Sequence, residues 1–175
     1  MVSEYDVTFA VKEWLLEHGW SVIAFNPPGA QGTFTIPNPS KNPNYRGQSG
    51  SESPDIIAMK EGTYVLIVES KPLFNQSDTE KLLNLNQNKD RMDLLIELLE
   101  QVCKANSVPF KKPVNIILAR AHGGQDSLSM DMQTFLVSTD NRWNPRKIDP
   151  KIDPYKFMKV VFKESNRVIG ELIRK

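Results

Sequence analysis

The chain has a single cysteine, Cys103, two histidines, and no apolar run long enough to cross a membrane. One cysteine cannot form an intramolecular disulfide, so we expect Cys103 to be a core residue of a protein in a reducing compartment. Neither His18 nor His122 lies in a recognisable partner motif, which argues against a Cys–His nucleophile. No signal peptide opens the chain and no internal repeat is present, so we expect a cytoplasmic protein.

Excess charge of one sign is also lacking, because the net charge is only +1 over 175 residues. Most DNA-binding domains are more basic than this. The charge is uneven, however: residues 142–175 carry ten Lys or Arg against four acidic residues, which leaves residues 1–141 net acidic. The length predicts a single domain over 1–175, with a long loop at 26–53 and a basic C-terminal extension at 142–175. The extension is either a solvated surface or a DNA contact.

Residues 53–71 form the most informative segment, two β-rich runs on either side of Gly62. Side chains alternate between the two faces of a strand, and both faces are apolar here. A strand pair that is apolar on both faces lies at the centre of a sheet and is covered on both sides. The residues on one face are Ile57, Met59, Val65 and Ile67, and those on the other are Ile56, Ala58, Leu66 and Val68.

Three charged residues stand at the ends of these apolar strands: Asp55, Glu69 and Lys71. A three-residue loop at 61–63 would place Asp55 directly opposite Glu69, and a β-bulge would have the same effect. A two-residue turn would instead place Asp55 opposite Val68. Directly opposite residues have Cβ atoms about 5 Å apart, close enough for two carboxylates to bind one divalent cation. The alternative is a hairpin whose ends carry ordinary solvated charges.

The pattern Pro54-Asp55, thirteen intervening residues, then Glu69-Ser70-Lys71 resembles the signature of the PD-(D/E)xK nuclease superfamily. That superfamily includes most type II restriction endonucleases, Holliday junction resolvases and many repair nucleases. The resemblance implies an α/β fold with a restriction-endonuclease-like core. Its central mixed sheet would have four to five strands flanked by helices, in the order αβββαβ.

Hydrophobic periodicity and capping signals predict elements in this order. We expect a helix over 1–18 that ends at Gly19, and a second long helix from a capping box at 77–80 to about Asn106. The predicted strands outside the hairpin are 20–25, 114–119, which we expect to lie in a parallel sheet, and 132–138. Weaker helical patterns cover 155–162 and 168–174.

The resemblance also implies a chemistry for the charged residues. Asp55, Glu69 and the backbone carbonyl of Ser70 would hold Mg²⁺, with Mn²⁺ able to substitute. The ion would polarise the scissile phosphate and activate a bound water, which Lys71 would orient or deprotonate. Several superfamily members add a glutamate from the first helix, for which the candidates are Glu4 and, as alternatives, Glu13 and Glu17.

Two further regions offer contacts to DNA. The loop at 26–53 is rich in proline and glycine and leads directly to Asp55, so it is either a functional loop or an irregular insertion. Donors for phosphates and base edges in this loop are Lys41, Tyr45, Arg46 and Gln48. In the C-terminal extension the candidates are Lys156, Lys159 and Lys163.

One catalytic centre cuts one strand, so a cut through double-stranded DNA requires a homodimer, a larger partner subunit or two successive visits. The sequence therefore predicts a Mg²⁺-dependent endodeoxyribonuclease, either a type II restriction endonuclease or the small catalytic subunit of one. A structure-specific repair nuclease or Holliday junction resolvase is the alternative enzyme. A non-catalytic DNA-binding scaffold on the same fold is the alternative outside the enzymes. No membrane partner is expected.

Overall fold

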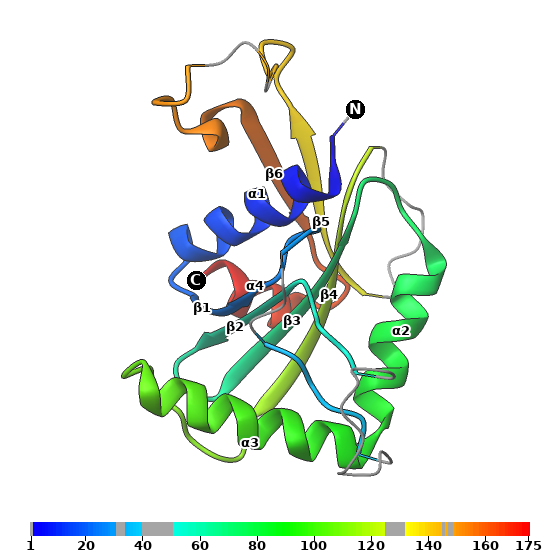
Figure 1. The fold of residues 1–175 in the computed structure, drawn as a ribbon, viewed down its shortest axis with the longest axis vertical. Helices are drawn as coiled ribbons and strands as arrows, with labels where there is room; N and C mark the ends of the chain where they lie inside the picture. The colour runs from blue at the N-terminus through cyan, green and yellow to red at the C-terminus, as the bar shows by residue number, and fades with distance from the viewer. Residues whose placement is uncertain (1, 31–33, 40–50, 125–131, 145, 147–148) are drawn as a thin grey trace.

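The computed structural model describes residues 2–30, 34–39, 51–124, 132–144, 146 and 149–175. Within these ranges the strands form one sheet in which each strand lies beside its neighbour in the sequence, from β1 to β6 (Figure 1). The six strands are β1 (Ser21–Phe25), β2 (Ile56–Lys60), β3 (Tyr64–Lys71), β4 (Asn115–Gly123), β5 (Gln133–Thr139) and β6 (Met158–Lys163). No helix in the described ranges is long and apolar enough to cross a membrane.

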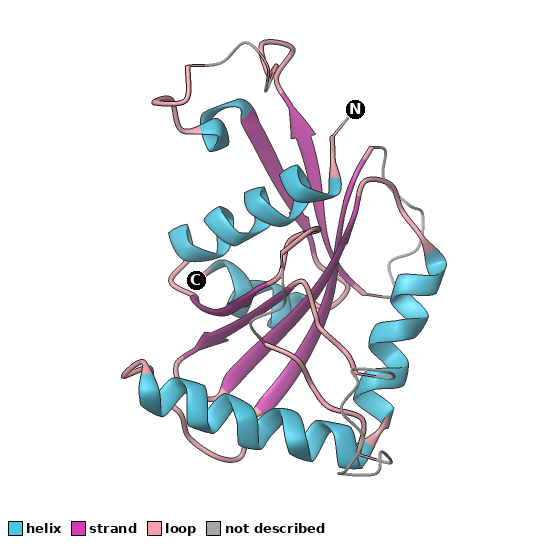
Figure 2. Cartoon of the chain, viewed as in Figure 1, coloured by secondary structure: helices cyan, strands magenta, loops and turns pink. Residues whose placement is uncertain are grey.

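The sheet is mixed, as expected. Strands β1, β2 and β3 are antiparallel, β3, β4 and β5 run parallel, and β6 returns antiparallel to β5. The expected four to five strands are an undercount, because β6 extends the sheet beyond β5. Helices cover both faces (Figure 2). They are α1 (Glu4–Glu17), α2 (Gln76–Gln87), α3 (Lys89–Ala105) and α4 (Arg167–Arg174).

The hairpin between β2 and β3 has the three-residue loop that places Asp55 opposite Glu69. Lys60 pairs with Tyr64 and Ile56 with Val68, so residues 61–63 form the loop. Glu61 and Gly62 have φ angles of 55° and 75°, in the left-handed region where glycine is favoured. This register is confirmed. The pairing of the two strands continues to Ile56 and Val68, next to the charged residues at the strand ends.

Both faces of the hairpin are buried, which confirms its central position. Ile56, Ala58, Leu66 and Val68 pack under α1 and α4 in one apolar cluster. Ile57, Met59, Val65 and Ile67 pack under α2 and α3 in a second cluster, which also contains Cys103. The cysteine is fully buried, as expected of a core residue.

The long helix expected over 77–106 is wrong, because the chain breaks it into α2 and α3 at Asn88. Asn88 ends α2 and caps α3, with its side chain accepting a hydrogen bond from the Arg91 amide. Asparagine side chains compete with the helix for backbone hydrogen bonds, which favours such breaks. The start also differs from the expected capping box, since Asn75 is the N-cap and accepts from the Ser77 amide.

Among its described residues, the C-terminal extension contains a 3-10 turn, the strand β6 and the helix α4. The helix expected over 155–162 is wrong: a 3-10 turn over Pro154–Phe157 leads into β6. Alternation explains the strand, because Met158, Val160 and Phe162 face the core while Lys159 and Val161 are exposed. The helix over 168–174 is confirmed as α4, which Asn166 caps.

We predict that Gly62→Ala destabilises the protein by about 1–2 kcal/mol, the cost of a left-handed alanine. A Cβ at this position would also lie 3.3 Å from Pro109, so crowding adds to the backbone strain. Gly29→Ala is the matched control, because Gly29 has a φ of +83° but, among the described residues, no atom lies within 4 Å of the place its Cβ would take. Urea unfolding should show the larger loss for Gly62→Ala, and equal losses would contradict a role for the Pro109 contact.

Candidate active site

The two predicted carboxylates meet where β2 begins and β3 ends. The Asp55 carboxylate accepts a hydrogen bond from the Ser70 amide at 2.6 Å, through Oδ2. This bond continues the β2–β3 pairing beyond Ile56 and Val68, the last pair of the ladder. Glu69 is the residue before Ser70, so Asp55 lies beside Glu69, as the hairpin register predicts.

The backbone of Ser70 offers a third oxygen on the same side. The N–H and C=O of one residue in an extended strand point to the same side of the strand. Because the Ser70 amide points to Asp55, its carbonyl is directed to that side as well. Two carboxylates and a carbonyl are oxygen donors of the kind that Mg²⁺ and Mn²⁺ bind, so the residues fit a divalent cation.

Glu69 is almost fully buried, with 4% of its surface exposed. Burial raises its pKa to about 7, and the negative charge of Asp55 acts in the same direction, against the nearby Lys81 and Lys71. Burial also raises the pKa of Asp55, although the Ser70 amide and Lys71 oppose that rise. Burial thus disfavours the charged form of both carboxylates in spite of the nearby lysines, and a bound cation would offset that cost.

Lys71 forms an ion pair with Glu4, whose Oε1 lies 2.8 Å from the lysine Nζ. Burial lowers the pKa of Lys71, but the hydrogen bond and charge of Glu4, together with the charge of Asp55, outweigh it and leave the pKa raised. Lys71 is therefore a protonated ammonium. Glu4 is the first residue of α1, directly after the N-cap Ser3, and the ion pair places this end of α1 next to the end of β3.

The three candidate glutamates of α1 have different partners. Glu4 reaches the site but contacts Lys71, and its role as a further metal ligand stays a prediction. Glu13 pairs with Lys12 at 2.7 Å, and Glu17 accepts a hydrogen bond from the Tyr155 hydroxyl at 3.0 Å. Among the described residues, no group of three His, Cys, Asp or Glu is placed to hold a metal ion.

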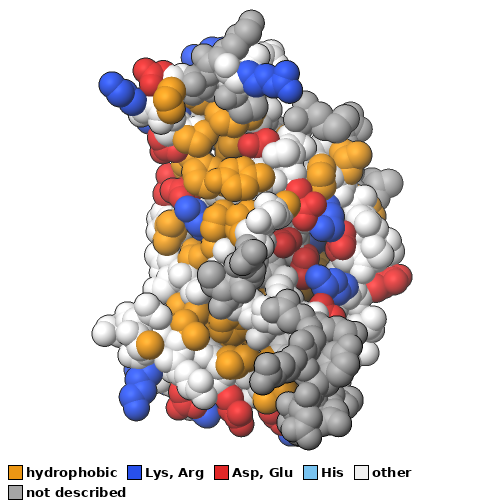
Figure 3. All heavy atoms as spheres, in the orientation of Figure 1, with side chains coloured by type: hydrophobic (Ala, Val, Ile, Leu, Met, Phe, Trp, Pro, Cys, Tyr) orange, Lys and Arg blue, Asp and Glu red, His pale blue; other side chains and the backbone are white. Residues whose placement is uncertain are grey.

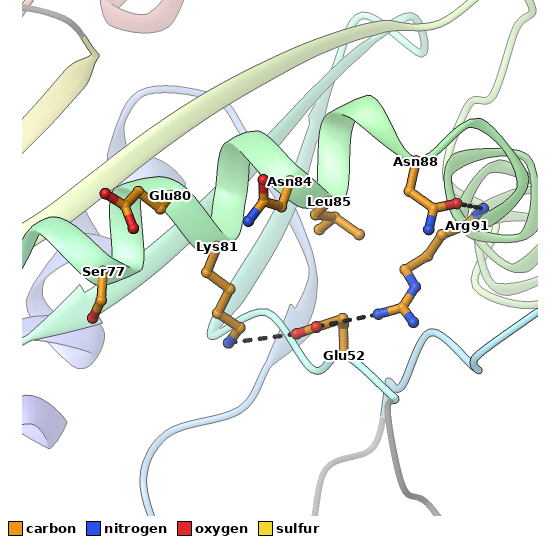
Figure 4. A pocket seen from close by; sticks show the side chains of 8 residues that line it. All are labelled: Glu52, Ser77, Glu80, Lys81, Asn84, Leu85, Asn88 and Arg91. Atoms are coloured by element: carbon orange, nitrogen blue, oxygen red, sulfur yellow. Dashed lines mark hydrogen bonds and ion pairs between the residues drawn. The ribbon is translucent and has the colours of Figure 1, made fainter.

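Sequence reasoning missed Lys81, a cation in direct contact with Glu69. Its Nζ lies 2.9 Å from Glu69 Oε1 and 3.7 Å from Glu52 Oε2, while Glu52 Oε1 lies 3.2 Å from Arg91. Lys81, Glu52 and Arg91 border a pocket of about 380 Å³ between α2 and the segment that precedes β2 (Figure 4). Lys81 lies on α2, away from the hairpin in the sequence, so strand alternation contains no signal for it.

Strand β4 places buried polar side chains beside the site, which the sequence analysis also missed. The register sets Arg120 beside Glu69 and His122 beside Lys71, on the same face of the sheet. Arg120 donates hydrogen bonds to the hydroxyls of Thr79 and Thr134. His122 is 1% exposed, burial lowers its pKa, and within the described part of the chain its Nε2 has no hydrogen-bond partner.

The predicted DNA contacts divide into two groups. Lys41, Tyr45, Arg46 and Gln48 lie outside the described residues. Lys156 is exposed on the 3-10 turn, and Lys159 and Lys163 lie on β6. One cross-strand row runs from β3 to β6 through Glu69, Arg120, Thr134 and Lys163.

Paired residues on adjacent strands share a face of the sheet, so Lys163 projects from the same face as Glu69. Three strand spacings separate β3 from β6, which puts the backbone of Lys163 roughly 14 Å from that of Glu69. Lys159 shares this face, because it lies four residues before Lys163 on the same strand. Figure 3 shows acidic and basic side chains gathered near α2, on the side of the molecule that carries the candidate site.

No family model matches the chain, and neither the curated proteins nor the solved structures contain a match. The geometry of the site is therefore the basis for any functional assignment.

We predict that Glu69→Gln stabilises the metal-free protein relative to wild type, and that the advantage grows with pH. The folded protein holds the Glu69 proton more tightly than an unfolded chain, because the pKa rises from 4.5 to about 7. Its contribution to stability is greatest below pH 4.5 and declines as the pH rises to 7. Between pH 5 and pH 8 the free energy of unfolding of the variant should rise by roughly 1–3 kcal/mol relative to that of wild type.

Urea unfolding with a chelator present measures this difference. Glu80→Gln, an exposed change on the same helix as Lys81, is the matched control and should show no such gain. If wild type and Glu69→Gln had the same pH dependence, the raised pKa of the buried Glu69 would be contradicted.

Proposed function

We propose that this chain is a divalent-metal-dependent endodeoxyribonuclease of the PD-(D/E)xK type. The observation that carries the proposal is the pair of largely buried carboxylates, Asp55 and Glu69, next to the protonated Lys71. Buried carboxylates without enough positive charge are costly to a fold unless they serve a bound cation or a reaction. The order from α1 to β4, with three antiparallel strands and a fourth parallel to the third, also agrees with the implied core.

In this proposal Asp55, Glu69 and the Ser70 carbonyl hold Mg²⁺ or Mn²⁺. When bound, the ion supplies Lewis-acid polarisation of the phosphate and a water of lowered pKa. Asp55 is oriented for its role by the Ser70 amide, which fixes one of its oxygens. The hairpin register holds both carboxylates in place, so little reorganisation is required when substrate binds.

Lys71 acts on the phosphate and the attacking water. Because Glu4 keeps Lys71 protonated, its ammonium is suited to orient the water and to stabilise negative charge on the phosphate oxygens, rather than to remove a proton. The oxygen of the water forms a bond to phosphorus and its proton passes to the solvent. The bond to the leaving oxygen breaks, and that oxygen takes up a proton from the solvent. Glu4 is then a positioning residue for Lys71.

We propose a type II restriction endonuclease, or the small catalytic subunit of one, as the biological form. The net charge of +1 gives weak long-range attraction to DNA, so affinity must come from local basic groups, a second copy or a larger partner. Incubating plasmid with Mg²⁺ distinguishes the candidates. Discrete fragments support a restriction enzyme, whereas cleavage confined to branched or damaged DNA supports a resolvase or repair nuclease.

We predict that Asp55→Ala lowers cleavage at least about a hundredfold, and that Lys71→Ala does the same while retaining Mn²⁺ binding. The reason is that Asp55 is a ligand of the ion, whereas Lys71 acts on water and phosphate. Plasmid nicking at high protein concentration measures the loss of cleavage in both variants, and calorimetric titration with Mn²⁺ measures the binding of the ion. Lys89→Ala, an exposed change on α3, should leave both unchanged.

Normal cleavage by Asp55→Ala would show that the site is wrongly assigned. Loss of Mn²⁺ affinity in Lys71→Ala with cleavage intact would contradict the division of roles between the two residues.

We predict that replacing Lys156, Lys159 and Lys163 with Glu weakens binding to duplex DNA without affecting the fold. Each lost phosphate contact should reduce the slope of log affinity against log salt by roughly 0.9. The matched control replaces Lys104, Lys111 and Lys112 with Glu, which changes the net charge by the same amount. These residues lie at the end of α3 and before the start of β4, whereas the candidate site lies at the carboxyl end of β4. Fluorescence anisotropy at several salt concentrations measures both triples, and equal losses would show that only the net charge matters.

A further inference from the structure

Lys81 is the residue of the site for which the proposed chemistry has no use. It comes from α2, one turn into the helix, and its ammonium lies 2.9 Å from Oε1 of the buried Glu69. The Lys81 side chain is itself 42% exposed, so the ion pair joins a buried acid to a base at the surface. The charge of Lys81 and its hydrogen bond oppose the rise of the Glu69 pKa more strongly than the charge of Lys71 does.

A second carboxylate lies on the other side of the same ammonium. Glu52 Oε2 is 3.7 Å from Lys81 Nζ, and Glu52 Oε1 is 3.2 Å from Arg91 (Figure 4). The backbone of Glu52 is held by two hydrogen bonds to Ile36, so its position is set by the fold. The side chains thus alternate in charge from the inside of the site to the N-terminus of α3, in the order Glu69, Lys81, Glu52 and Arg91.

The pocket beside Lys81 gives its side chain space to move. It has a volume of about 380 Å³, and its lining includes Lys81, Glu52, Glu80 and the amides Asn84 and Asn88. A lysine has four rotatable side-chain bonds, so its ammonium can leave Glu69 and remain close to Glu52. The carboxylate and amide oxygens of the lining can then accept its hydrogen bonds.

We propose that Lys81 is the built-in counter-ion of Glu69, which a divalent cation must displace in order to bind. In the metal-free protein the ammonium neutralises the buried carboxylate. When the cation binds at Asp55 and Glu69, like-charge repulsion moves the ammonium to Glu52 and the adjoining pocket. This inference rests on the proposed metal site, and it makes Lys81 and Glu52 positioning residues that set the affinity of that site.

The first test measures Mn²⁺ binding by calorimetry, in the absence of DNA. Lys81→Met should raise the affinity about tenfold, because it removes a positive charge next to a ligand of a doubly charged ion. Lys81→Arg keeps the charge and should retain an affinity within about threefold of wild type. Lys89→Met, which removes an exposed charge from α3, is the matched control for net charge and should have little effect.

The second test asks whether Glu52 acts through Lys81. Glu52→Gln should weaken Mn²⁺ binding, because Lys81 then remains on Glu69 and the site loses a negative charge. In the Lys81→Met background most of this effect should disappear, since the residue that Glu52 draws away is absent. Circular dichroism and thermal unfolding of each variant establish that it is folded before it is titrated.

The outcomes separate this inference from the proposed function. If wild type and Lys81→Met both bind no Mn²⁺, the metal site itself is wrong. If wild type binds Mn²⁺ but Lys81→Met binds no more tightly than Lys89→Met, the metal site stands and the counter-ion role is overturned. An equal effect of Glu52→Gln in both backgrounds would likewise exclude its action through Lys81.

Discussion

The pairing of β2 with β3 is the constraint on which the rest of the site depends. A three-residue loop sets the register, and the register brings Asp55 beside Glu69. A shift of one residue would turn every side chain of one strand to the opposite face. It would bury the wrong apolar residues and separate the two carboxylates. The fold and the site are therefore specified by the same hydrogen-bonded ladder, and the Ser70 amide extends that ladder to the Asp55 side chain.

Burying two neighbouring carboxylates imposes a second constraint, the need for positive charge close to them. The chain meets this need from two directions. Lys71 stands at the end of β3 and is held by Glu4 of α1, and Lys81 reaches in from α2. The two helices lie on opposite faces of the sheet, so the site is completed only when both have packed against it. Charge balance at the site is thus linked to the packing of the whole domain.

The same sheet connects the candidate site to the basic C-terminal extension. Because β6 pairs with β5, Lys159 and Lys163 share the face of the sheet that carries Glu69 and Lys71. A chain of near-neutral net charge can thereby present a local basic surface on the same face as the carboxylates. This arrangement would suit the proposed nuclease, with a second copy or a larger partner supplying most of its affinity for DNA.

The sequence by itself determined the features that depend on neighbouring residues. Alternation along the hairpin predicted its two buried faces. The spacing of Asp55 and Glu69 allowed them to meet through a three-residue loop or a bulge but not through a two-residue turn, and the structure decided for the three-residue loop. The signals for α1, β4, β5 and α4 were equally local, because periodicity and caps act within a few residues. The tertiary structure decided what depends on contacts between distant segments. The arrival of Lys81, Arg120 and His122 at the site follows from packing across the sheet, and no local pattern contains that information. The break at Asn88 and the strand β6 do have local signals, an asparagine cap and alternating side chains, but packing decided that these outweigh the helical patterns.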